Sequence, residues 1–179
     1  MSQNKNNYAA GFDTPLGRMI LVAEDASAEN KLPSSLNLIG LGFAGTKMNE
    51  EAVMANLSKQ LRCHDVVTQP AKLASLAKQI LTQPNKVPVL LRGTDFQKRV
   101  WHRLMEIPVG TTVTYGQIAA DLDSAPRAIG TAVGKNPISL VVPCHRVIGS
   151  TGHLHGYRWG LDVKKCLLAA EGAPVSVAL

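Results

Sequence analysis

Two prolines near the middle of the chain, Pro84 and Pro88, separate two halves with different hydrophobic patterns. In the first half, short apolar runs are separated by polar turns, whereas in the second half apolar residues recur mainly at helical spacing. Proline has no amide hydrogen and its ring clashes inside a helix, so the pair interrupts any regular element between residues 83 and 89. We therefore expect a linker there and two domains, residues 1–88 and 89–179, which suits a chain of 179 residues.

The first half predicts an α/β domain. Apolar runs at 19–23 and 36–43 indicate strands, with a turn at Thr14–Gly17 and a further short strand at 64–68. The range 49–61 has helical periodicity and acidic residues in its first turn, where the helix dipole favours them. A second helix is indicated by apolar residues that share a helical stripe: Leu73, Leu76, Ala77, Ile80 and Leu81.

The second half predicts a mainly helical domain. Apolar stripes indicate helices at 96–105, 115–122 and 127–135, and residues 138–142 form a strand-like apolar run. The break between the second and third of these helices is short, which is typical of a helix-turn-helix. A last helix is expected where four residues share an apolar face: Val163, Cys166, Leu167 and Ala170.

Composition excludes several classes of protein. The hydrophobic fraction of 45% is that of a globular chain, and no apolar run approaches the roughly 20 residues of a membrane helix. The polar start of the chain lacks the apolar stretch of a signal peptide, so we expect a cytoplasmic protein. Cys63, Cys144 and Cys166 are too scattered for a disulfide scaffold or a four-ligand zinc site. The net charge of +6 suits a polyanionic partner, although many basic proteins bind no nucleic acid.

Residues 40–45 match the pattern G-x-G-x-x-G, which joins a strand to a helix in dinucleotide-binding proteins. Three features argue against a cofactor site here. Residues 46–48 separate the last glycine from the helix, Asp65 precedes the next strand instead of ending it, and no further strand–helix–strand units follow. We therefore interpret these glycines as part of a strand and its turn.

The adjacent residues Cys144 and His145 are the strongest candidates for chemistry. Cysteine is the best nucleophile among the side chains once it is a thiolate, and a neighbouring histidine can promote that state. A buried structural cysteine is nevertheless the commoner explanation of an isolated Cys-His pair. The surrounding sequence changes that balance.

Several motifs around Cys144 occur in a fixed order. They are Gly-Thr-Asp-Phe at 93–96, Thr-Tyr-Gly-Gln-Ile-Ala at 114–119, Pro-Cys-His-Arg-Val at 143–147, Gly-Tyr-Arg-Trp-Gly at 156–160 and Leu-Leu-Ala-Ala-Glu-Gly at 167–172. In this order they closely resemble the 6-O-alkylguanine-DNA alkyltransferases. The resemblance is strong over most of the second half and weaker over the first half, where Thr14–Gly17 matches loosely.

The resemblance implies a fold and an activity. The fold would be an N-terminal ribonuclease-H-like α/β domain followed by a mainly α C-terminal domain with a helix-turn-helix. The partner would be double-stranded DNA containing alkylated guanine, from which the damaged base is flipped out. The alkyl group of O6-alkylguanine, and also of O4-alkylthymine, would pass irreversibly to Cys144, once per molecule. The resemblance implies a monomer without a metal, a cofactor or an obligate protein partner.

The resemblance also implies roles for particular residues. His145 would deprotonate Cys144 through a water molecule, and Glu171, which follows Cys144 at the spacing found in the family, would polarise His145. Asn136 would brace the segment before the active site. The residues that would contact the base or the DNA are Tyr115, Gly116, Arg127, Ser150 and Tyr157.

One departure concerns Arg127, which matches the arginine that fills the space of the flipped base. Family members usually have a longer segment between the positions of Tyr115 and Arg127, and their proline lies further ahead of the arginine. Here the segment is shortened and Pro126 directly precedes the arginine. The shortening removes part of the first turn of the expected recognition helix, so Arg127 would lie at the helix start and its side chain could point in a different direction from that in the family.

Two other classes of function compete with alkyl transfer. Relatives that bind alkylated DNA without accepting the alkyl group carry another residue in place of the cysteine, so Cys144 argues against a pure binding module. A cysteine hydrolase would need a separate histidine positioned against Cys144, and it would release product over many turnovers.

Overall fold

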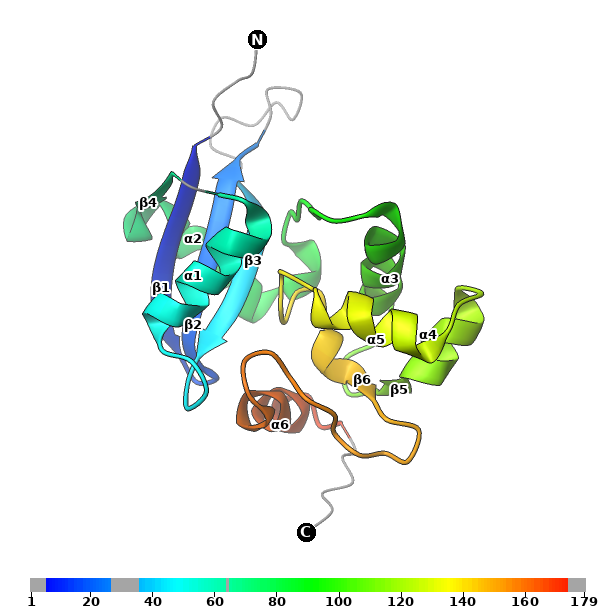
Figure 1. Ribbon diagram of the computed structural model, residues 1–179. Helices are drawn as coiled ribbons and strands as arrows, with labels where there is room; N and C mark the ends of the chain where they lie inside the picture. Colours follow the sequence, from blue (N-terminus) through cyan, green and yellow to red (C-terminus); the bar gives the residue numbers. More distant parts are fainter. Residues whose placement is uncertain (1–5, 27–35, 64, 174–179) are drawn as a thin grey trace. The chain divides into compact units, whose positions relative to one another are not determined.

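The computed structural model describes residues 6–26, 36–63 and 65–173, and the chain divides into two compact units, residues 1–92 and 93–179 (Figure 1). The first unit extends beyond residue 88 because the segment after Pro88 pairs with the sheet. The Leu38 amide donates to the Pro88 carbonyl at 2.8 Å, and the Leu90 amide donates to the Leu38 carbonyl at 2.9 Å. The first unit is α/β and the second is mainly helical, as the sequence predicts.

The first unit is a four-stranded sheet with the order β3-β2-β1-β4. Strands β1 (Asn7–Thr14), β2 (Gly17–Asp25) and β3 (Leu36–Ala44) are antiparallel neighbours, and β4 (Val66–Thr68) runs parallel to β1. Helices α1 (Glu50–Leu61) and α2 (Pro70–Thr82) lie on opposite faces of this sheet, and the short helix η1 (Pro84–Lys86) follows (Figure 1). The central residues of β2 are buried because both faces are covered.

Gly40 lies within β3, in agreement with the interpretation of its glycine-rich motif as strand and turn. A Cβ atom at Gly40 would come within 2.9 Å of Leu61 Cδ1 on α1, so a larger residue would require the Leu61 side chain to shift. The turn after β3 is closed by a hydrogen bond from the Gly45 amide to the Met48 carbonyl. Helix α1 begins only afterwards, where the Asn49 side chain accepts the Ala52 amide at 2.8 Å.

The second unit contains helices α3 (Asp95–Met105), α4 (Tyr115–Asp121), α5 (Pro126–Gly134) and α6 (Leu161–Ala170), with the short helix η2 (Cys144–Arg146). Strands β5 (Val113–Thr114) and β6 (Val147–Ile148) form a small parallel pair. Helices α4 and α5 are joined by residues 122–125, as the short break predicts. The Trp101 ring, which is buried on α3, donates its Nε1 hydrogen to the Ala132 carbonyl of α5 at 2.9 Å.

The structure corrects three expectations. Residues 138–142 form a tight turn instead of a strand, with Leu140 at a φ of 68° and the Val142 amide donating to the Ile138 carbonyl. Cys166 is exposed on α6, because this helix buries Val163, Lys164, Leu167 and Leu168 instead. On α2, Leu81 is 43% exposed although its helical stripe suggested burial. Strand β1 was not expected, because its Gly11 and alanines give only a weak strand signal.

Candidate active site

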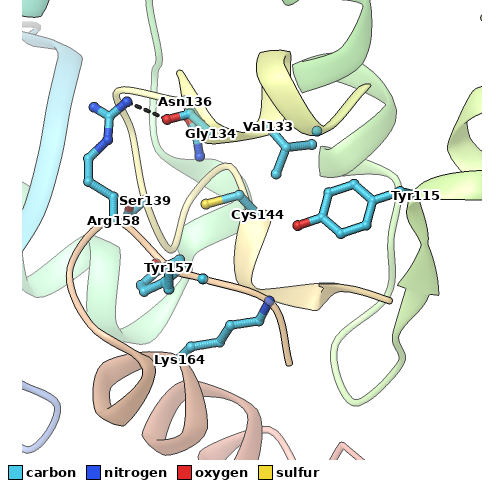
Figure 2. Close-up of a pocket in the computed structure, with 11 residues that line it drawn as sticks. Tyr115, Val133, Gly134, Asn136, Ser139, Cys144, Tyr157, Arg158 and Lys164 are labelled. Atoms are coloured by element: carbon cyan, nitrogen blue, oxygen red, sulfur yellow. Dashed lines mark hydrogen bonds between the residues drawn. The ribbon is translucent and has the colours of Figure 1, made fainter. Parts of the chain in front are cut away.

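A cavity of about 80 Å³ opens beside Cys144 in the second unit (Figure 2). Cys144 is only 7% exposed, and its side chain points into the cavity between Tyr115 and Tyr157. Helix α5 forms one wall, and the segment before α6 forms the other. The lining residues are Tyr115, Gly130, Val133, Gly134, Asn136, Ser139, Cys144, Gly156, Tyr157, Arg158 and Lys164.

Asn136 sets the path of the chain that leads to Cys144. Its Nδ2 donates to the Val142 carbonyl at 2.8 Å, and its Oδ1 accepts the Ile138 amide at 3.0 Å. These bonds close the turn at 138–142, so the chain reverses and enters η2 at Cys144. Because Asn136 is itself buried, its amide satisfies backbone groups that a strand partner would otherwise take.

Next to Cys144 in the chain, His145 and Arg146 form a compact cluster with Glu171. His145 is fully buried, and its Nε2 lies 2.9 Å from Glu171 Oε1. Arg146 donates two hydrogen bonds to the same carboxylate, from Nε at 2.9 Å and from Nη2 at 2.7 Å. Its Nη1 also donates to the Ile107 carbonyl after α3. The cluster therefore ties η2 to both α3 and the end of α6.

The environment of this cluster decides its protonation. Burial lowers the pKa of His145, and the opposing effect of Glu171 does not overcome it, so the ring is neutral near pH 7. Burial alone would raise the pKa of Glu171, but hydrogen bonds from His145 and Arg146 lower it to about 2. The His145 Nδ1 atom is buried and has no hydrogen-bond partner among the described residues. A neutral ring that donates from Nε2 to Glu171 has Nδ1 available as a base.

The groups around the Cys144 sulfur are suited to give protons. Burial raises the pKa of Tyr115 and, more strongly, of Tyr157, and a negative charge on Cys144 adds to both effects, so the two hydroxyls stay protonated. Lys164 is 1% exposed and donates to the Val147 carbonyl at 2.7 Å. Burial lowers the pKa of Lys164 to about 8, although the Cys144 charge opposes the change. The ring of His155 meets the Tyr115 ring edge-on, with centroids 6.1 Å apart.

The structure brings together some of the residues expected from the sequence and leaves others apart. Cys144, Asn136, Tyr115 and Tyr157 line the cavity, and His145 and Glu171 lie in the cluster behind it. Gly116, Arg127 and Ser150 are exposed and do not line it. Arg127 lies in the first turn of α5, and the N-cap residue Ala125, which precedes the helix, supplies no side-chain cap.

Four polar or charged residues of the site were not expected: Ser139, Arg146, Arg158 and Lys164. Arg146 could have been suspected, because an arginine within an apolar stretch requires a buried partner. Lys164 falls at a buried position of α6 and raises the same question. Ser139 and Arg158 carry no local signal, since their contacts depend on turns that bring distant segments together.

The comparisons with known proteins agree on one family. Residues 95–173 match the profile described as 6-O-methylguanine DNA methyltransferase, DNA binding domain. A methylated-DNA–protein-cysteine methyltransferase of Methanosarcina acetivorans is 55% identical over 83 residues, which are 45% of this chain and 53% of that relative. The chain thus spans about half the length of this curated relative.

Solved structures are similar over nearly the whole chain. The O6-methylguanine methyltransferase of Mycobacterium tuberculosis is 32% identical, with a TM-score of 0.71 over 94% of this chain and 95% of that one. A structure of the OGT of the same organism in complex with DNA is 33% identical, with a TM-score of 0.70 over 93% and 95% of the two chains.

Because of the cluster of His145, Arg146 and Glu171, we expect the second unit to lose stability as the pH falls. In the unfolded chain His145 and Glu171 return to ordinary pKa values of 6.5 and 4.5, whereas both values are lower in the folded state. The unfolded state therefore binds more protons, and stability falls as the pH drops below about 6.5 and again from about 4.5 toward 2. Glu171→Gln should flatten the second loss, and should cost about 3 kcal/mol at pH 7 because buried Arg146 loses its partner.

Urea unfolding at a series of pH values measures this effect, and both tryptophans of the chain, Trp101 and Trp159, report on the second unit. The matched control is Glu106→Gln, since Glu106 is exposed and makes only a 3.9 Å contact with Arg103. The control should change stability by less than about 0.5 kcal/mol. An unchanged pH profile in Glu171→Gln would contradict the assignment.

Proposed function

The chain belongs to the 6-O-methylguanine DNA methyltransferase family, and on that premise we propose that it repairs DNA by taking the alkyl group of O6-alkylguanine onto Cys144. The observation that carries the proposal is a cysteine facing a cavity with a buried, neutral histidine directly behind it. The carboxylate of Glu171 orients that histidine from the far side of its ring. This is the arrangement of nucleophile, base and orienting group used in nucleophilic catalysis.

The proposed step is an in-line displacement at the alkyl carbon. The Cys144 thiol gives its proton, through one water molecule, to Nδ1 of His145, and the resulting thiolate attacks the carbon. The bond between that carbon and the guanine oxygen breaks, and its electron pair stays on the guanine. The Tyr115 hydroxyl donates a hydrogen bond to the leaving base and stays protonated, and the proton that His145 took from the thiol passes on through water to the guanine. The electrons balance within this exchange, so the step requires neither a metal nor a cofactor.

A thioether is the product on the protein, and it offers no easy route back to a thiol. Each molecule would therefore act once. The same displacement would accept O4-alkylthymine, because that lesion also presents an alkyl carbon bonded to an oxygen of a leaving base. Lys164, a buried cation that lines the same cavity as Cys144, stabilises negative charge there during the attack.

We assign the DNA contacts to the pair α4 and α5, acting as a helix-turn-helix, and to the base-flipping residue Arg127. Residues 127, 130 and 134 of α5 share one helix face, because they lie at spacings of three and four along the helix. Gly130 and Gly134 border the cavity, so Arg127 lies about one turn away from it on the same face. An added Cβ at Gly116 would meet only Thr114 Oγ1 at 3.8 Å, so its small size fits a DNA contact better than a packing role. We propose that Ser150, which is exposed in the turn after β6, contacts the bound base from the edge of the site.

The remaining parts of the proposal concern the whole chain. The mixed sheet between two helices supports a ribonuclease-H-like fold for the first unit. A cysteine that must stay reduced fits a cytoplasmic location, and we propose that the chain acts there as a monomer. No helix within the described residues is long and apolar enough to cross a membrane.

Incubation with DNA that carries O6-methylguanine should add one methyl group, about 14 Da, to Cys144, because this thiol lies beside the histidine cluster. Intact mass measurement followed by peptide mapping identifies the site. Cys144→Ala should abolish the transfer but keep DNA binding, whereas Cys166→Ser removes an exposed thiol and should leave the transfer unchanged. A methyl group on Cys63 or Cys166, or repeated turnover, would overturn the proposal.

Arg127→Ala tests the flipping role. Extruding a paired base costs a few kcal/mol, which a side chain filling the vacated stack would offset. We expect the variant to slow transfer from duplex DNA by at least about tenfold, and transfer from free 6-O-benzylguanine by less than about twofold. Single-turnover kinetics with both substrates make the comparison. Equal slowing on both substrates would place Arg127 in the pocket or the fold instead.

A further inference from the structure

The cavity beside Cys144 is narrow in this structure. Its volume is about 80 Å³, whereas pockets that enclose a small molecule commonly measure roughly 300–1,000 Å³. A purine base with its substituent therefore does not fit until the walls separate. Opening the cavity requires that the contact holding the two walls together be released.

The side chain of Arg158 joins the two walls. It extends from the segment before α6, and its Nη2 donates to the Gly134 carbonyl at the last residue of α5 (Figure 2). The last carbonyls of a helix lack partners within the helix and carry the negative end of its dipole. A guanidinium is therefore well matched to this acceptor, and the bond is charge-assisted.

The backbone on either side of Arg158 is anchored more firmly than its side chain. Trp159 is fully buried and donates its Nε1 hydrogen to Ser139 Oγ at 2.6 Å. Tyr157, on the other side, is buried against the cavity. The turn that carries Ser139 is in turn held by Asn136. Release of the half-buried Arg158 side chain is thus a smaller change than displacement of the loop.

We propose that Arg158 is a latch that closes the cavity and sets the size of the electrophile that reaches Cys144. A small reagent passes while the latch is closed, and a bulky one reacts only when Nη2 leaves the Gly134 carbonyl. This inference deepens the proposed function and rests on it, because it names a specificity-determining residue of the same site. Its test, however, needs no DNA.

The experiment compares the labelling rates of Cys144 by iodoacetamide, a small electrophile, and by N-phenylmaleimide, a bulky one. Peptide mapping separates Cys144 from Cys63 and Cys166. Arg158→Met removes both the donor and the charge at similar side-chain length, and it should raise the ratio of bulky to small rates about fivefold. Taking the ratio cancels any change in the thiolate fraction, which affects both reagents alike.

Arg99→Ala is the matched control, because Arg99 donates to a backbone carbonyl, that of Leu122, at 3.4 Å and outside the cavity. Its ratio should change by less than about 1.5-fold. Arg158→Gln, which also loses the charge, provides a second variant if Arg158→Met does not fold, and its ratio should rise at least about twofold. An unchanged ratio in a folded Arg158 variant would overturn the latch.

A methyl-transfer assay with methylated DNA distinguishes a failure of the latch from a failure of the proposed function. A raised labelling ratio without any methyl transfer would keep the latch and refute the alkyltransferase proposal. Methyl transfer with an unchanged ratio would keep the proposed function and refute the latch.

Discussion

The ion cluster of His145, Arg146 and Glu171 is the interaction on which the second unit depends. Glu171 lies at the C-terminal end of α6, where the helix dipole disfavours a negative charge. Two hydrogen bonds from Arg146 and one from His145 reverse that balance and hold the carboxylate ionised. Because Arg146 also bonds to the Ile107 carbonyl, the same cluster fixes α6, η2 and the end of α3 relative to one another. The reaction proposed for Cys144 therefore depends on the same contacts that hold these three elements together.

A second constraint acts on the other side of Cys144. The buried amide of Asn136 bonds to both ends of the turn at 138–142, so the cysteine enters the cavity from a rigid support. Helix α5 approaches from the opposite side, with Gly130 and Gly134 at the cavity. Cys144, the proposed nucleophile, therefore lies between a fixed histidine and a helix that we assign to DNA.

Much of the fold could be predicted from local patterns. The apolar runs of β2 and β3, the acidic start of α1 and the stripe of α3 carry their own signals, because burial on one face repeats with the period of the element. The turn at 138–142 could not be predicted in this way. Its residues are mostly apolar, and only the side-chain bonds of Asn136 turn the run back on itself. The exposure of Leu81 and Cys166 likewise depends on which neighbour each helix meets.

The residues of the site also fall into two groups, those that the sequence revealed and those that only the fold brings together. Cys144 and His145 are adjacent, so their pairing was visible in the sequence, whereas Glu171 lies far along the chain and was expected only through a family resemblance. Arg146 and Arg158 escaped prediction because their partners, Glu171 and the Gly134 carbonyl, are distant in the chain. Charge alone marks an arginine as needing a partner, but the fold decides which one.

The central claim is that His145 is a neutral base whose Nδ1 serves Cys144. Nitrogen NMR of isotope-labelled histidine reads the tautomer and protonation of this ring directly, with the resonance assigned from a His145→Gln variant. The account predicts a neutral ring at pH 7, with its proton on Nε2 toward Glu171 and a pKa below the ordinary 6.5. A ring with its proton on Nδ1, or a doubly protonated ring at pH 7, would contradict it.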